Sequence, residues 1–175
     1  MVRTLIIGYG NFDRQDDGVA WHVLAEVARR LGCAVPFSPE EEFPLNSGNP
    51  DFIFELQLMP ELAEMIAQYA RVCFVDAHTG AVPHDVNVNA IAAEFQASPL
   101  THHLTPQSLL TFAQTLYDAR PEAMLVSVRG YQFGFERELS PLTAQLAQDA
   151  AGKIVEWVID PGASRTARSS IEIDG

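Results

Sequence analysis

The segment 4–19, TLIIGYGNFDRQDDGV, constrains the fold of this chain more than any other. Its apolar run predicts a buried strand that ends in a Gly-Tyr-Gly-Asn turn at residues 8–11. Two adjacent carboxylates, Asp16 and Asp17, follow this turn, and Gly18 then precedes the apolar start of a helix. Open α/β sheets bind ligands at the carboxyl ends of their strands. The segment therefore predicts a strand–turn–helix unit that carries acidic groups at a potential ligand site.

The rest of the chain alternates between predicted strands and predicted helices. Strands are expected at 3–8, 52–56, 72–77, 86–93 (an edge strand) and 124–130. Helices are expected at 18–31, at 60–70, from Pro106 and at 141–159. Thr105 is expected to cap the third of these helices, and Ser140 precedes the fourth. This order predicts a three-layer α/β/α fold, with a mostly parallel twisted sheet of about five strands and helices on both faces. We expect one domain over residues 1–160 and a flexible tail over 161–175.

Composition and charge disfavour some classes of partner. The chain has 175 residues, of which 11 are basic and 23 acidic, so its net charge is −12. This charge disfavours nucleic acid, whose phosphates need Lys and Arg, and it is compatible with a basic peptide or a metal ion. The sequence has no apolar run long enough for a membrane span and no signal peptide at its start, so we expect a cytoplasmic protein. Cys33 and Cys73 form no disulfide framework, and Cys73 is expected to be a buried thiol.

Polar residues follow several of the predicted strands. Asp17 comes after the first strand, Asp76 ends the strand VCFVDA, and the pair His102-His103 precedes a predicted helix. In a parallel sheet these positions converge on one edge. Two carboxylates and an imidazole form a ligand set for a divalent metal, and they are equally suited to acid–base catalysis. The pattern alone leaves both possibilities open.

Other sites are poorly supported by the sequence. A dinucleotide-binding fingerprint would need a third glycine where Asp13 stands, and the Walker, G-x-S-x-G and HExxH patterns are missing from the sequence. Asp16 or Asp17 could serve only to cap the first helix, and Asp76 could have a purely structural partner. Because His102 and His103 are adjacent, we expect only one of them to face the site.

Four segments, in order, resemble the hydrogenase maturation endopeptidases, which process the large subunit of nickel–iron hydrogenases. IIGYGNFDRQDDGVAWHVL is similar to the family signature G-x-G-N-x-x-x-x-D-[DE]-G, and VCFVDA is similar to the family strand that ends in Asp. THHLTPQSLL resembles the segment T/S-H-x-[LM] that opens a helix, and SVRGYQFGFERELSP resembles the last strand with its glycine-containing loop. The loop at 33–51 is longer and more acidic than the family usually has, and Ala20 stands where the family often has Gly.

The resemblance implies a function and a site. It implies an endopeptidase of aspartic or metal-assisted type that removes a C-terminal extension from the precursor of a hydrogenase large subunit after nickel insertion. Asp17, Asp76 and His102 would contact the nickel, which the substrate supplies, and would carry the catalysis; no metal is expected to bind tightly to the free enzyme. Asp16 would support the helix start or the loop, and His103 would fall on a variable position. The alternative is a maturation factor of the same fold that binds the metal or the precursor without cleaving it.

Overall fold

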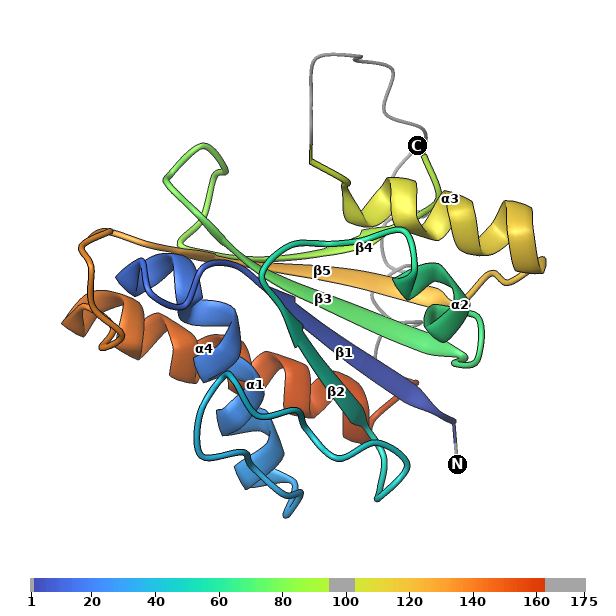
Figure 1. The fold of residues 1–175 in the computed structure, drawn as a ribbon, viewed down its shortest axis with the longest axis horizontal. Coiled ribbons are helices and arrows are strands. Elements are labelled where there is room, and N and C mark those ends of the chain that lie inside the picture. Colours follow the sequence, from blue (N-terminus) through green and yellow to red (C-terminus); the bar gives the residue numbers. More distant parts are fainter. Residues whose placement is uncertain (1, 95–102, 163–175) are drawn as a thin grey trace, which may run out of the picture.

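The computed structural model describes residues 2–94 and 103–162. Its centre is a five-stranded sheet with the strand order β2-β1-β3-β5-β4 (Figure 1). The strands are β1 (Thr4–Tyr9), β2 (Asp51–Glu55), β3 (Arg71–His78), β4 (Val86–Ile91) and β5 (Glu122–Arg129). All neighbouring strands are parallel except β4, which runs antiparallel to β5 at the edge of the sheet. The mostly parallel sheet and the edge position of residues 86–91 confirm the sequence prediction.

Helices cover both faces of the sheet (Figure 1). The 3-10 helix η1 (Gln15–Gly18) leads into α1 (Val19–Arg30), which packs with α4 (Pro141–Ile159) on one face. The other face carries α2 (Leu62–Ile66) and α3 (Pro106–Tyr117). This arrangement is the predicted three-layer α/β/α architecture.

The central strand β3 explains why its sequence is continuously apolar. Val72 and Phe74 pack with α2 and α3, whereas Cys73 and Val75 pack with α1 and α4, and all four are fully buried. Strands with helices on both faces bury both sets of alternating side chains. Burial also raises the pKa of the Cys73 thiol, and the predicted buried cysteine is confirmed.

Local signals set some of the helix ends. The Thr105 hydroxyl accepts a hydrogen bond from the Ser108 amide at 3.1 Å, and Pro106 occupies the first turn of α3, as predicted. Gly32, with a φ of +70°, follows the end of α1. The helix predicted from Pro60 is shorter than expected, because the chain on either side of α2 forms turns instead of continuing the α-helix.

The segment between α1 and β2 contains no helix or strand in the structure, as its four prolines predicted. Most of the tail predicted to be flexible lies outside the described residues, as does His102. Among the helices that the structure describes, none is long and apolar enough to cross a membrane.

Candidate functional site

The turn after β1 brings an acidic segment back over the end of the strand. Gly10 has a φ of +144°, and a Cβ atom at this position would lie 2.2 Å from the main-chain oxygen of Asp17. A Cβ atom at Gly18 would lie 2.6 Å from the Cα atom of Phe12. Only glycine permits approaches as close as these. The two glycines therefore position η1, and Asp17 with it, directly beside the turn.

Asp17 is partly exposed, and one hydrogen bond orients its carboxylate. Its Oδ2 atom accepts a hydrogen bond from the main-chain amide of Asn11 at 2.8 Å. No described residue donates a hydrogen bond to its Oδ1 atom. The side chain is thus held in place by the turn while part of its bonding capacity remains unused.

Asp76 comes from β3, and the same turn holds it. Its Oδ2 atom accepts a hydrogen bond from the Tyr9 hydroxyl at 2.8 Å. Its Oδ1 atom is buried, and no described residue donates a hydrogen bond to it. A buried carboxylate oxygen without a partner is costly, so such an atom suits a ligand that completes the site.

The electrostatics of Asp76 point in the same direction. Burial raises the pKa of Asp76 above its ordinary value, while the Tyr9 hydroxyl, the Ser127 side chain on the neighbouring strand and His78 oppose this rise. The negative charge of Asp17 adds to the upward shift of this pKa. A cation bound by both acids would relieve this repulsion.

The third predicted residue, His102, lies outside the described residues. His103 is exposed and leads into α3, whose N-terminal end lies toward the carboxyl ends of the parallel strands (Figure 1). Over residues 2–94 and 103–162, no group of three or more His, Cys, Asp and Glu side chains could hold a metal ion. The structure thus brings together Asp17 and Asp76, and the role of His102 stays a prediction.

Asp16, the other acid of the doublet, is turned away from this pair. It is fully buried, and its carboxylate accepts hydrogen bonds from the amides of Tyr131, Gln132 and Ser140 and from the hydroxyls of Ser140 and Thr143. Burial alone would raise the pKa of Asp16, but these hydrogen bonds outweigh burial and lower it. Asp16 therefore supports the loop after β5 and the start of α4, rather than the start of α1.

Sequence reasoning missed Tyr9. It occupies the unspecified position of the Gly-Tyr-Gly turn, and nothing in its spacing indicates that it reaches a strand 67 residues later. Burial and the neighbouring Asp76 raise the pKa of its hydroxyl, so Tyr9 remains a hydrogen-bond donor at neutral pH. The only available signal was its place beside the predicted site.

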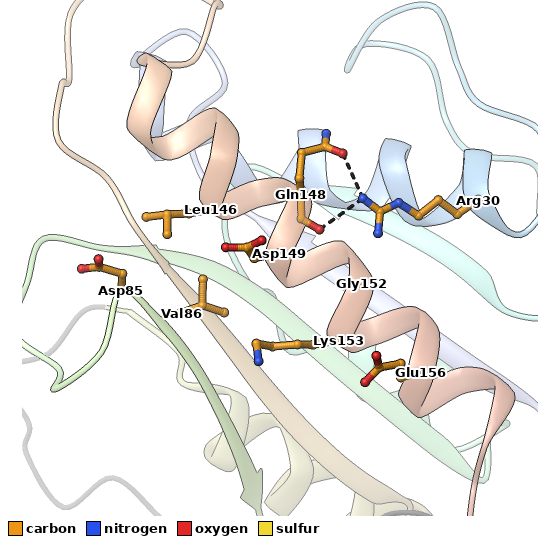
Figure 2. A pocket seen from close by; sticks show the side chains of 9 residues that line it. All are labelled: Arg30, Asp85, Val86, Leu146, Gln148, Asp149, Gly152, Lys153 and Glu156. Atoms are coloured by element: carbon orange, nitrogen blue, oxygen red, sulfur yellow. Dashed lines mark hydrogen bonds between the residues drawn. The ribbon is translucent and has the colours of Figure 1, made fainter.

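An open hollow of about 610 Å³ lies elsewhere, between α4 and the start of β4 (Figure 2). Its lining mixes both charges, with Arg30 and Lys153 near Asp85, Asp149 and Glu156. Neither Asp17 nor Asp76 contributes to it. Because this hollow is open to solvent and neither acid lines it, we assign the candidate site to the two acids and not to this hollow.

The molecule is a three-layer α/β/α sheet protein with an acidic pair at the carboxyl ends of its strands. Comparison with known proteins identifies solved structures that share this fold. Neither the protein-family models nor the curated protein sequences give a match. Among solved structures, the chain is similar to the [NiFe] hydrogenase maturation protease HycI from Thermococcus kodakarensis KOD1, with a TM-score of 0.59, 20% identity, and coverage of 90% of this chain and 92% of the other.

Two solved structures from Escherichia coli have the same fold. The hydrogenase maturating endopeptidase HybD has a TM-score of 0.61 and 16% identity, over 91% of this chain and 94% of the other. The solution structure of an endopeptidase from the same organism has a TM-score of 0.63 and 15% identity over the same shares of the two chains. The chain therefore has the fold of the hydrogenase maturation proteases over nearly its full length.

Proposed function

We propose that this protein is an endopeptidase that removes a C-terminal extension from the precursor of a nickel–iron hydrogenase large subunit after nickel insertion. The observation that carries the proposal is the pair Asp17 and Asp76, held by one turn at the carboxyl ends of β1 and β3 in the fold of hydrogenase maturation proteases. This position is where open α/β sheets bind their ligands.

The chemistry of the pair supports recognition of a metal that the substrate brings. Carboxylate and imidazole are suitable ligands for nickel, as are the thiolates of a substrate. The buried Oδ1 atom of Asp76 has no hydrogen-bond donor among the described residues and suits such a contact. With His102 as the third contact, cleavage would depend on nickel already bound in the precursor.

Hydrolysis has two possible routes within this proposal. The nickel of the substrate would activate a water molecule, or Asp17 or Asp76 would accept a proton from it as a general base. Both routes require the two carboxylates. A precursor prepared without nickel is expected to remain uncut in either case, because the metal forms part of the recognised surface.

The test is co-expression with a hydrogenase large-subunit precursor, followed by intact-mass measurement of the large subunit. The variants Asp17→Ala, Asp76→Ala and His102→Ala are expected to leave the precursor at full length. Asp149→Ala, an exposed acid in the hollow of Figure 2, is the matched control and is expected to process normally, as is His103→Ala.

The outcomes separate the alternatives. If all three site variants process the precursor normally, the site assignment is wrong. If the wild-type protein binds the precursor without ever shortening it, the protein is a binding factor and not a peptidase.

A further inference from the structure

The loop between β5 and α4 is braced against the segment that carries the candidate site. The main-chain amide of Gln15 donates a hydrogen bond to the main-chain carbonyl of Glu136 at 2.8 Å. The main-chain amide of Gly134 donates a hydrogen bond to the side-chain oxygen of Gln15 at 3.1 Å. The buried carboxylate of Asp16 binds both ends of the loop. The loop therefore has a fixed conformation, and what it exposes is held ready for contact.

At its tip this braced loop exposes a large aromatic side chain. Phe135 is 88% exposed, and the guanidinium carbon of Arg14 lies 4.4 Å from the centre of its ring. Aromatic and arginine side chains on a rigid support are the residue types that dominate binding energy in protein interfaces. An exposed phenylalanine has no evident role in folding.

Arg14 also differs from the other arginines that the structure describes. Every other arginine in the described residues pairs with a carboxylate within 4 Å, and Arg14 does not. The three acids nearest to it in sequence are engaged elsewhere: Asp13 by Arg137, Asp16 by the loop, and Asp17 by the Asn11 amide. Arg14 is thus left with a guanidinium group available to an external carboxylate.

The position of Arg14 ties this surface to the candidate site. Its carbonyl accepts a hydrogen bond from the Asp17 amide at 3.2 Å, so the two residues belong to one turn. Arg14 and the Phe135 ring that it contacts therefore lie beside the turn that holds the candidate acids.

We propose that Arg14 and Phe135 form a contact surface for the hydrogenase large-subunit precursor, where a carboxylate of the precursor pairs with Arg14 and an adjacent apolar side chain packs on Phe135. The proposal rests on the proposed function for the identity of the partner. The charge of the occupant follows from the unpaired guanidinium, and its apolar part follows from the exposed ring.

The experiment measures binding and cleavage separately with purified, nickel-loaded precursor. The variants Arg14→Ala and Phe135→Ala are each expected to weaken binding and to raise KM by about 5- to 10-fold, with kcat changed less than about twofold. The Arg14→Ala variant should also show a weaker dependence of binding on salt. Because the two side chains stack on each other, the double variant should weaken binding by less than the product of the two single fold-changes.

Two control variants match these changes at the far end of the molecule. Arg120→Ala removes an exposed arginine just before β5, and Ile159→Ala removes an exposed apolar side chain at the end of α4. Both are expected to bind and cleave like the wild type. Equal binding by the test and control variants would overturn the proposed surface.

The two proposals fail in different ways. If the wild type binds the precursor without cleaving it, the proposed peptidase is wrong, and the binding constants of the variants still decide the surface. If the wild type cleaves while Arg14→Ala and Phe135→Ala bind as tightly as the controls, only the surface is wrong. If the wild type neither binds nor cleaves, both proposals are overturned.

Discussion

The hydroxyl of Tyr9 donates a hydrogen bond to Asp76 Oδ2 over 2.8 Å, so the turn after β1 holds an acid that β3 contributes. Two residues further along, the Asn11 amide holds Asp17 over the same distance. One short turn thus orients both carboxylates of the candidate site.

The first prediction concerns the Tyr9 hydroxyl. Tyr9→Phe keeps the ring but removes the donor that fixes Asp76, and we expect precursor processing to slow by about 10- to 100-fold, the usual effect of losing a residue that orients a metal ligand. Binding of the precursor should change much less. The measurement is single-turnover cleavage at saturating enzyme. Tyr117→Phe, on the exposed side of α3, is the control, and equal rates for the two variants would contradict the assignment.

The second prediction concerns the conflict between stability and activity at Asp76. Burial raises the pKa of Asp76 in the folded protein above its pKa in the unfolded chain. Ionised Asp76 therefore destabilises the fold, and this loss of stability develops as pH rises from the unfolded-state pKa through the folded-state pKa. Asp76→Asn is neutral and still accepts a hydrogen bond from Tyr9, so it should unfold at a higher temperature than the wild type at pH 7. Processing should fall by at least about 100-fold.

The stability gain of Asp76→Asn should disappear at acidic pH, where the wild-type carboxyl is also neutral. Thermal unfolding followed by circular dichroism at several pH values checks this dependence. A variant that is less stable than the wild type at pH 7 would show that the ionised Asp76 is well compensated in the folded protein.

The third prediction has the opposite sign and concerns Asp16. Hydrogen bonds hold the pKa of Asp16 in the folded protein below its ordinary value. The ionised carboxylate therefore stabilises the fold fully at pH values above the unfolded-state pKa, and this stabilisation is lost as pH falls through the folded-state pKa. Asp16→Asn presents a donor where several donors converge, and it should lower the free energy of unfolding at pH 7 by about 3 kcal/mol.

Urea unfolding at pH 7 and at low pH measures this effect, with Asp149→Asn as the exposed control. The difference between Asp16→Asn and the wild type should shrink at low pH. An unchanged midpoint at pH 7 would mean that the loop after β5 does not depend on this carboxylate.

The fourth prediction tests the glycine turn itself. Gly10→Ala places a Cβ atom 2.2 Å from the Asp17 carbonyl oxygen at a φ that only glycine adopts readily. We expect a loss of about 2 kcal/mol or more in unfolding free energy and a loss of processing, since relief of the clash must move Asp17. Gly48→Ala, where a Cβ atom meets nothing within 4 Å, should change neither quantity.

Much of the architecture could be predicted from local patterns. Three patterns act within a few residues: the apolar run of β3, the cap at Thr105 and Pro106, and the glycine after α1. Each therefore predicts local structure without knowledge of the tertiary fold. The helix after Pro60 was overestimated because its apolar spacing continues through residues that the structure forms into turns.

The sequence by itself determined the order of strands and helices and the presence of acids after β1 and at the end of β3, because these depend on hydrophobic periodicity and on short turns. The resemblance assigned different roles to the two acids of the doublet, but only the tertiary structure shows their different surroundings, since Asp16 meets donors from residues 131–143 and Asp17 meets the turn beside it. It also decided that Tyr9 reaches Asp76 and that Arg14 has no acidic partner among the residues that the structure describes. Such relationships depend on which distant segments become neighbours in space, and spacing along the chain carries no information about that.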